Sequence, residues 1–351
     1  IVPAMGVGVY VFGFRALLLT LISVAFSVFF EWGYRKLMKK DSTIGDLSAV
    51  ITGILIAFCM PANAPYWLPI PGAFFAIIVV KQLYGGIGKN FLNPALAARA
   101  ALLLSWPALM TTWAKPFSYS SLFNFAGDAV TSATPMASLQ QGILPAATLN
   151  QMFLGYTGGS LGEVSALALL AGGIYLLLRK IISARIPLSY LLTVAVLTFL
   201  FPKGGNGHLQ WMLYNLLGGG LMLGAIFMAT DYTTSPVTTR GQIIYGVGCG
   251  LLTVFIRAFG SYPEGVSYSI LIMNVCVWLI DKYTLPRRFG VSRADLKAQK
   301  AKAKEEKRQA KAEAKLLAAA AAEAEKEAES VTEEAEAVGE AEAATEEAEE
   351  A

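Results

Sequence analysis

The fold is decided by the apolar stretch GILIAFCMP, residues 53–61, because a similar stretch occurs a second time in the chain. The second copy is GLMLGAIFM, residues 220–228, and a proline follows each copy within eight residues, at Pro65 and Pro236. The copies lie about 170 residues apart, and five apolar segments separate them. An odd number of membrane spans inverts the second copy, so the repeat predicts two inverted halves with broken helices, as in many transporters. Chance similarity between apolar helices is the alternative.

The composition separates a membrane domain from a tail. Of the 351 residues, 55% are hydrophobic and 15% are charged. Residues 1–290 carry 18 Lys or Arg and 8 Asp or Glu, a net charge of +10, whereas residues 316–351 have a net charge of −12. Residues 291–351 are rich in Ala, Glu and Lys and have no apolar stripe that could bury a core. We therefore expect a charged C-terminal tail that is partly helical and partly disordered.

Ten apolar segments precede this tail and predict an all-α polytopic membrane protein of about ten transmembrane helices in two inverted five-helix repeats. We place the first repeat at residues 1–109, with a first helix that we expect to be incomplete, and the second at residues 162–290. The polar interval 110–161 lies between them as a loop. Several segments are shorter than the roughly 20 residues of a full crossing, which indicates half-helices buried in protein.

The positive charges set the orientation. If the C-terminus is cytoplasmic, the cytoplasmic connections contain eleven Lys or Arg residues, Lys81 and Lys89 among them, and the opposite connections contain four. Basic residues concentrate on the cytoplasmic side of membrane proteins. We therefore expect both ends of the chain in the cytoplasm and the loop 110–161 on the outer side.

The outer loop contains one chemically distinctive stretch, GDAVTSATP, residues 127–135. Its small side chains let a bulky group approach the backbone, and its hydroxyls offer donors, acceptors or a point of covalent attachment. An ordinary turn rich in Ser and Thr is the alternative.

Four motifs occur in the order GGIGKNFLNPA (85–95), TSATP (131–135), GSLGEVS (159–165) and a pair formed by FMATD (227–231) and RAFGSYPEG (257–265). Together they resemble the family that contains the D subunit of the Rnf complex and the B subunit of the sodium-pumping NADH:quinone reductase. The resemblance covers roughly residues 1–290. It implies a multi-pass protein of a bacterial or archaeal cytoplasmic (inner) membrane.

The resemblance also implies two flavins. In the family, FMN is attached through a phosphoester to the last threonine of the second motif, which is Thr134 here. Thr131, Ser132 and Ala133 complete the motif, with Ser132 where glycine is the commonest residue, and Asp128 precedes it as an acid does in the family. A second, non-covalent flavin, riboflavin, is expected within the membrane helices, but no motif assigns its contacts.

In function, the resemblance implies a subunit of a redox-driven pump. Electrons would pass between ferredoxin and NAD, coupled to Na⁺ or H⁺ movement, and the chain would be active only within its complex. Its partners would be a second outer-side FMN subunit, Fe–S subunits and membrane lipid. We expect no catalytic side chain, no nucleic-acid surface and no dinucleotide site, since no dinucleotide fingerprint follows a strand. The alternatives are the B subunit of the quinone-reducing pump and a non-redox transporter with inverted repeats.

Charge and shape suggest further residues for the flavin site. A flavin phosphate is an anion, which favours positive charge nearby. Arg257 would lie on the outer side, and Arg99 could reach the site if its helix is broken or buried. Glu163 is a possible ion-pair partner, and Gly158 would let the chain wrap around a planar ring. Structural ion pairs and ordinary loop glycine are the alternatives.

The second half offers a candidate ion path. Asp231 ends its apolar segment, where freed carbonyls and a carboxylate could hold a cation, and we place Asn93 on the same path. A helix-capping role is the alternative for Asp231. The three cysteines are isolated in apolar runs and His208 is the only histidine, so we predict no metal site built by this chain alone.

Overall fold

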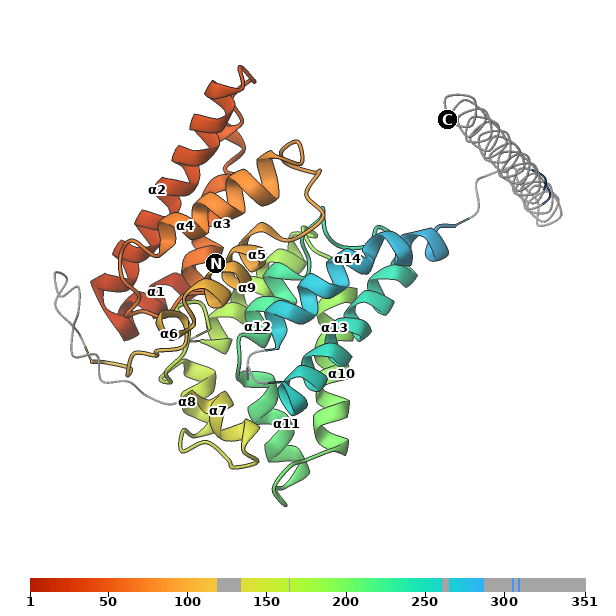
Figure 1. Ribbon diagram of the computed structural model, residues 1–351. Helices are drawn as coiled ribbons and strands as arrows, with labels where there is room; N and C mark the ends of the chain where they lie inside the picture. Colours follow the sequence, from red (N-terminus) through yellow and green to blue (C-terminus); the bar gives the residue numbers. More distant parts are fainter. Residues whose placement is uncertain (119–133, 164, 261–264, 287–304, 306–308, 310–351) are drawn as a thin grey trace, which may run out of the picture. The chain divides into compact units, whose positions relative to one another are not determined.

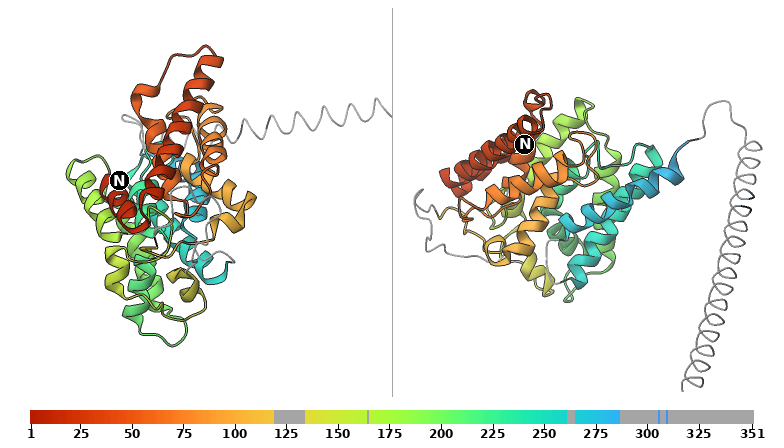
Figure 2. Two further views of the ribbon diagram at one scale, coloured as in Figure 1. Left: turned by 90° about the vertical axis from the view of Figure 1, so that its left-hand side faces the viewer. Right: turned by 45° about the horizontal axis from the view of Figure 1, so that its top comes forward.

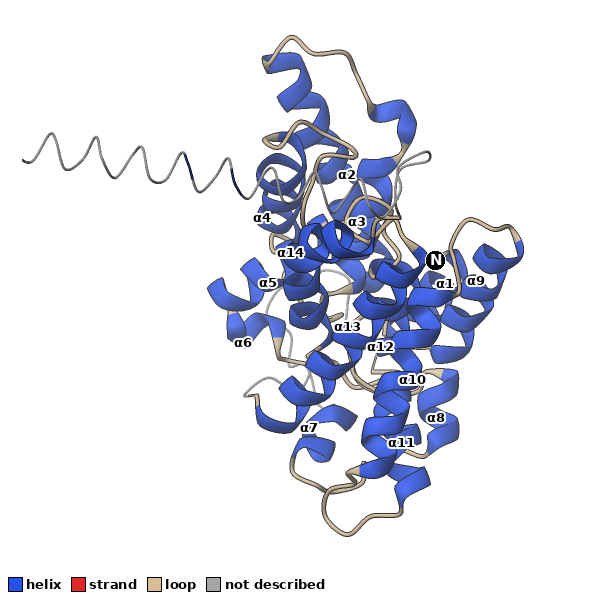
Figure 3. Ribbon diagram, turned by 90° about the vertical axis from the view of Figure 1, so that its right-hand side faces the viewer, coloured by secondary structure: helices blue, strands red, loops and turns tan. Residues whose placement is uncertain are grey.

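The computed structural model describes residues 1–118, 134–163, 165–260, 265–286, 305 and 309. Within them every regular element is a helix (Figure 3), which confirms the predicted all-α class. The chain divides into two units, Ile1–Leu285 and Pro286–Ala351. The helices described below belong to the first unit.

The first half of that unit contains seven helical elements: α1 (Val2–Phe12), α2 (Phe14–Leu37), η1 (Ile44–Asp46), α3 (Ser48–Phe58), α4 (Pro69–Phe74), η2 (Phe75–Gln82) and α5 (Pro94–Ser105). Three short helices follow: α6 (Pro107–Met110), α7 (Pro135–Gln140) and α8 (Leu149–Leu154). The second half contains α9 (Ala166–Leu178), α10 (Arg185–Leu200), α11 (His208–Leu217), α12 (Leu221–Leu223), η3 (Gly224–Met228), α13 (Thr239–Phe259) and α14 (Val266–Thr284). The elements η2 and η3 are π-helical.

Three of these helices, α2, α13 and α14, are long and apolar enough to cross a membrane by themselves. The helix α11 and the following segment Leu221–Met228 form a fourth candidate, bent by 64° at the break between them. Six shorter apolar helices lie at the other positions where the sequence predicts spans. A polytopic helical membrane protein is therefore supported, whereas the number of ten spans and their inverted repeat stay predictions.

The helices pack mainly within their own half of the sequence. In Figures 1 and 2, α2 lies against α3 and α4, and α13 lies between α10 and α14. Contacts of α1 with α9, and of α5 with α14, join the halves. The short helices α5, α9 and α12 lie near the middle of the unit (Figure 1).

Small residues bring the main helix pairs close together. A Cβ on Gly53 of α3 would lie 2.7 Å from the Cα of Val24 on α2. In the same contact, Ser23 of α2 donates to the carbonyl of Gly53 at 2.7 Å. On α13, a Cβ on Gly250 would lie 2.6 Å from the Cβ of Thr193 on α10. Close backbone approach at small residues is how membrane helices gain packing energy.

Candidate functional site

The chain breaks after α3, and the freed carbonyls of this break are bound by an arginine. From Cys59 to Leu68 the backbone is not helical, and in lipid no water would satisfy its carbonyls. Arg15 of α2, which is buried, donates from Nε to Ala62 at 3.1 Å and from Nη2 to Ala64 at 3.0 Å. Its Nη2 also donates to the carbonyl between these two, at 3.2 Å. The planar guanidinium thus holds the break in a fixed shape.

The motif at residues 159–165 closes the same break from the other side. The amide of Leu161 donates to Met60 at 3.0 Å, and the amide of Gly162 donates to Phe58 at 3.0 Å. The remaining carbonyl in this run, that of Cys59, accepts from Arg99 at 2.6 Å. These donors satisfy carbonyls at the end of α3 that have no partner within the helix. The motif is therefore a cap for α3.

A second break separates α11 from α12, and it too is held by a buried arginine. Arg257 of α13 donates from Nη1 to Asn215 at 2.6 Å and from Nη2 to Gly218 at 2.9 Å. Gly219 and Gly220 have φ angles of +69° and +65°, a conformation that favours glycine. A Cβ on Gly219 would lie 2.6 Å from Nη2 of Arg257 and 3.0 Å from Cγ of Met136. Arg257, this break and α7 therefore meet at one point.

Two cavities adjoin the second break. The first, which we call the Arg257 cavity, has about 400 Å³ including the part that opens to solvent, and its lining includes Met136, Gln140, Lys203, Trp211, Asn215 and Arg257. The second, which we call the Arg99 cavity, has about 310 Å³ measured in the same way, and its lining includes Cys59, Arg99, Ser160, Glu163, Gly219 and Gly220. The second cavity is built by both breaks together.

Thr134 caps α7, the helix that contributes Met136 and Gln140 to the first of these cavities. Its Oγ1 accepts from the amide of Ala137 at 3.3 Å, and its side chain is 6% exposed. Arg257 lines the same cavity as Met136, two residues after Thr134 on α7.

The other residues predicted for the flavin site do not lie together. Arg99 and Glu163 line the Arg99 cavity together, and Glu163 also accepts from the hydroxyl of Ser160 at 2.8 Å, so it stabilises its own loop. Gly158 is half-buried and lines neither cavity. Four predicted residues, and the C-terminal tail apart from residues 305 and 309, lie outside the described ranges; the four residues are Asp128, Thr131, Ser132 and Ala133.

Arg257, which lines the Arg257 cavity, has donors that fit an anionic group. The Nε of Arg257 is buried and has no hydrogen-bond partner among the described residues. Nη2 donates to two carbonyls and Nη1 to one, so Nε and the second hydrogen of Nη1 remain for a ligand. A phosphate oxygen is the acceptor that a guanidinium prefers. The residues present therefore suit the phosphate of a flavin attached nearby.

Asn93 bonds the end of η3, three residues before Asp231. Asn93 caps α5 and donates from Nδ2 to the carbonyl of Met228, the last residue of η3, at 3.1 Å. Three residues further on, the carboxylate of Asp231 accepts from the hydroxyls of Thr233 at 3.1 Å and Thr234 at 3.2 Å. The turn that contains Asp231 is thus fastened to both halves of the chain.

Asp231 lies in this turn, beyond the last helical residue. Burial raises the pKa of its carboxyl group above the ordinary value, although hydrogen bonds from the backbone and hydroxyl of Thr233 and from Thr234 oppose the rise. The carboxyl group therefore takes up a proton more readily than an exposed aspartate does. This property suits a group that exchanges protons or cations, and it also suits a simple buried cap.

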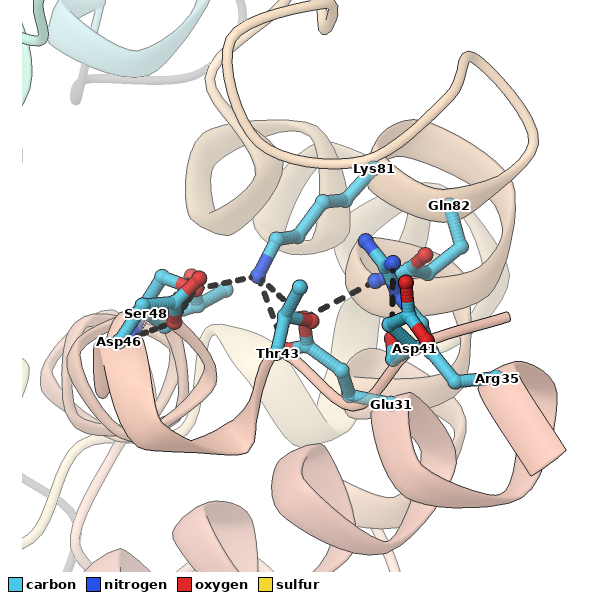
Figure 4. Close-up of polar contacts among 9 residues, drawn as sticks. Glu31, Arg35, Asp41, Thr43, Asp46, Ser48, Lys81 and Gln82 are labelled. Carbon is cyan, nitrogen blue, oxygen red and sulfur yellow. Dashed lines mark hydrogen bonds and ion pairs between the residues drawn. The ribbon is translucent and has the colours of Figure 1, made fainter.

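The structure contains a polar site that the sequence interpretation missed (Figure 4). Glu31 of α2 is fully buried and forms an ion pair with Lys81 of η2 at 2.8 Å. Thr43 at 2.7 Å and Gln82 at 3.0 Å also donate to Glu31, and Lys81 donates to Ser48 at 2.6 Å. Lys81, which the sequence interpretation counts with the cytoplasmic connections, is 3% exposed, and its side of the membrane stays a prediction. The sequence signal that could have indicated this site is Glu31, a single acid within a long apolar segment.

Comparisons with known proteins agree with the motifs. The model of the NQR2, RnfD, RnfE family matches residues 1–290. The chain is 50% identical over 304 residues to a protein of Acetobacterium woodii named as the D subunit of a Na⁺-translocating ferredoxin:NAD⁺ oxidoreductase complex, covering 85% of this chain and 90% of the relative. It is 42% identical over 300 residues to the D subunit of a proton-translocating ferredoxin:NAD⁺ oxidoreductase complex of Clostridium ljungdahlii, covering 83% and 89%.

A more distant relative comes from Escherichia coli. It is named as the D subunit of an ion-translocating oxidoreductase complex and is 35% identical over 320 residues, covering 82% of this chain and 91% of the relative. The region matched by the family model includes both helix breaks and both cavities described above. The family resemblance expected from the four motifs is confirmed, and the chain belongs to the NQR2, RnfD, RnfE family.

Proposed function

We propose that this chain is the membrane-embedded D subunit of an ion-translocating ferredoxin:NAD oxidoreductase complex. The observation that carries the proposal is the 50% identity over 304 residues to a relative with that function in its name, nearly the full length of both proteins. The chain lies in a cytoplasmic membrane and works with an outer-side FMN subunit and Fe–S subunits. It transfers electrons and contributes to Na⁺ or H⁺ transport, and it has no ferredoxin or nicotinamide site of its own.

Within this proposal, FMN is bound covalently to Thr134 by a phosphoester. Thr134 caps the helix that lines the Arg257 cavity, and Nε of Arg257 has no partner among the described residues; both observations support this assignment. Arg257 would hold the phosphate, and Met136 and Trp211 would offer apolar surface. A flavin supplies reversible electron transfer, while the protein sets its position and surroundings. A second flavin, riboflavin, belongs to the same proposal, and its contacts stay open.

Covalent flavin is tested by in-gel fluorescence. The complex is purified, denatured and separated by electrophoresis, and the band of this chain is excited with ultraviolet light. We expect yellow-green fluorescence in the natural chain and none in Thr134→Val, because valine matches the shape of threonine but has no oxygen to esterify. Thr111→Val, at an exposed threonine of the same loop, is the matched control and should stay fluorescent. A natural chain without fluorescence, or a fluorescent Thr134→Val, would refute the assignment.

The turn that contains Asp231 is our candidate for ion coupling, with Asn93 as its anchor. We expect Asp231→Asn to reduce ion transport at least about tenfold while flavin fluorescence changes by less than about twofold, because asparagine keeps the shape and loses the charge. Ion uptake is measured in proteoliposomes driven by ferredoxin and NAD. Equal losses of transport and of flavin would instead indicate the capping role.

A second candidate is the B subunit of the sodium-pumping NADH:quinone reductase, because the matching family model also includes NQR2. The purified complex decides between them. Quinone reduction without any ferredoxin activity would favour the quinone-reducing pump. A non-redox transporter is the third possibility, and a chain that holds no flavin after denaturation would favour it.

A further inference from the structure

The end of α2 and the loop after η2 together form a positively charged surface. The last turn of α2 contains Arg35 and Lys36. The loop after η2 contains the glycine-rich stretch GGIGKN, residues 85–90. Figure 4 shows the side chain of Arg35 extending from α2 toward Gln82, the last residue of η2. The two segments therefore meet although they are far apart in the sequence, and neither the flavin site nor the ion-coupling turn includes them.

Two positive side chains of this surface lie on adjacent glycines. A Cβ on Gly86 would lie 2.7 Å from Nη2 of Arg35. A Cβ on Gly85 would lie 2.7 Å from Cδ of Lys89 and 3.5 Å from its Nζ. The φ angles of Gly85 and Gly86 are +113° and +96°, in a region that larger residues rarely adopt. The glycines thus leave space in which a guanidinium group and an ammonium group approach each other.

Neither positive group has a negatively charged partner among the described residues. In that part of the chain one ion pair is found, and it joins Lys81 to Glu31. Among the described residues Arg35 donates only from Nη1, to the carbonyl of Asp41 at 3.1 Å, and its Nε is buried without a partner. Like charges repel each other, so their approach is costly unless an anion binds between them. The surface therefore has donors and positive charge to offer to an external anion.

Two general rules explain only part of this arrangement. Basic residues favour the last turn of a helix, and they also collect at the cytoplasmic ends of membrane helices. Lys36 and Lys40 fit these rules, because they lie over the rings of Trp32 and Tyr34, at 4.8 Å and 5.5 Å from the ring centroids. Arg35 extends instead to the loop after η2. Neither rule requires that contact.

Large apolar side chains are exposed around the positive groups. Trp32 is 44% exposed, Tyr84 is 51% exposed and Ile87 is 55% exposed. The helix α2 is long and apolar enough to cross a membrane, which would put its last turn at the depth of the lipid head groups. Trp and Tyr are favoured at that depth. The surroundings therefore suit an anion that has acyl chains better than they suit a free phosphate ion.

We propose that Arg35 and Lys89, which the two glycines bring together, bind the phosphate group of an anionic membrane lipid. Phosphate oxygens are good acceptors for a guanidinium group, and the ammonium group adds a second positive charge. The exposed apolar side chains around them contact the acyl chains. The bound lipid ties the end of α2 to the loop after η2. The site is a property of this chain and goes beyond the redox function proposed above.

Native mass spectrometry of the whole complex tests the site. The complex is purified in detergent, depleted of lipid and titrated with phosphatidylglycerol, and this chain is then released in the gas phase with the lipid that it retains. We expect the chain to bind phosphatidylglycerol at least about tenfold more tightly than phosphatidylcholine, whose head group has no net charge. Arg35→Gln/Lys89→Gln should remove this preference, because glutamine keeps a polar side chain and loses the charge.

Two further variants control for folding and for general charge. Lys180→Gln, at an exposed lysine between α9 and α10, removes a positive charge elsewhere and should keep the preference. Lys89→Gln alone changes an exposed residue and should weaken phosphatidylglycerol binding at least about threefold. The unfolding midpoint without lipid is measured on every variant. If the double variant does not fold, the single Lys89→Gln variant decides.

Inorganic phosphate distinguishes a lipid site from a general phosphate site. At the same concentration as the lipid, we expect it to leave bound phosphatidylglycerol in place. Displacement of the lipid under these conditions would overturn the lipid assignment. Equal binding of the two lipids by the natural chain, or a preference that persists in the folded variants of Arg35 and Lys89, would refute the site. None of these measurements depends on whether the chain carries a flavin.

Discussion

At the scale of single residues, two types of side chain make the helix breaks possible. Arginine provides several donors in one rigid plane, and Arg15 and Arg257 each bind carbonyls at one break. Glycine provides the space for close approach. Gly162 donates its amide to Phe58, and a Cβ on Gly162 would lie 2.6 Å from the Cγ of the same phenylalanine. A larger residue there would push the cap away from the carbonyl that it binds.

We predict that Gly162→Ala destabilises the protein by about 1–3 kcal/mol, the usual cost of overpacking a filled core. Thermal unfolding of the purified complex, followed by the release of this chain, measures the effect. Gly33→Ala is the matched control, because nothing lies within 4 Å of a Cβ at Gly33 of α2. Alanine favours the helix by roughly 0.5–1 kcal/mol over glycine, so the control should be neutral or slightly more stable. Equal unfolding temperatures for the two variants would contradict this account of Gly162.

At the scale of helical elements, the packing of α2 against η2 depends on one buried ion pair. Glu31 and Lys81 satisfy each other, and the neighbouring hydroxyl and amide groups occupy the remaining positions around them (Figure 4). Taking two charges out of water is costly, so such a pair adds little net stability. Removing only one partner of the pair is strongly destabilising, because the remaining charge would be buried without a counter-charge.

We predict that Lys81→Met destabilises the protein by about 3–5 kcal/mol, since it leaves the carboxylate of Glu31 without its cation. The double variant Lys81→Met/Glu31→Gln should recover most of this loss, because it removes both charges. The yield and the unfolding temperature of the complex in detergent report the effect. Lys39→Met, at an exposed lysine, is the control and should change neither. A double variant as unstable as the single one would show that the hydrogen bonds matter more than the charges.

At the scale of the whole molecule, the question is which of the shorter helices cross the membrane. Three helices are long enough by themselves and a bent pair makes a fourth. If only these four cross, residues 89, 141 and 180 all lie on one side. If ten segments cross, residue 141 lies on the side opposite to the other two. The inverted repeat requires the second arrangement.

We predict the second arrangement, with Gln141 outside and Lys89 and Lys180 in the cytoplasm. Each of these exposed residues is replaced by cysteine in turn, and cells are treated with a maleimide that does not cross membranes. Gln141→Cys should be labelled in intact cells, whereas Lys89→Cys and Lys180→Cys should be labelled only after the cells are opened. The natural chain is the control, because Cys59 and Cys249 are buried and Cys276 is partly buried. Labelling of all three sites from the same side would rule out ten spans.

Much of this organisation could be predicted from the sequence. Hydrophobic length located the helices, and the motif order identified the family, because both signals are local. The pairing of Glu31 with Lys81 could not be predicted, because the two residues are 50 positions apart and only the fold brings them together. The same holds for the cap that Gly162 makes on α3.

The cap on α3 also has a consequence for biosynthesis. Phe58 and Met60 receive their donors from Gly162 and Leu161, which are synthesised about a hundred residues later. At about 5–20 residues per second, the end of α3 waits on the order of 5–20 s in the nascent chain before those donors leave the ribosome. During this interval its carbonyls must be shielded by the insertion machinery or by water. The break after α3 can therefore reach its final structure only after residues 161 and 162 have been translated.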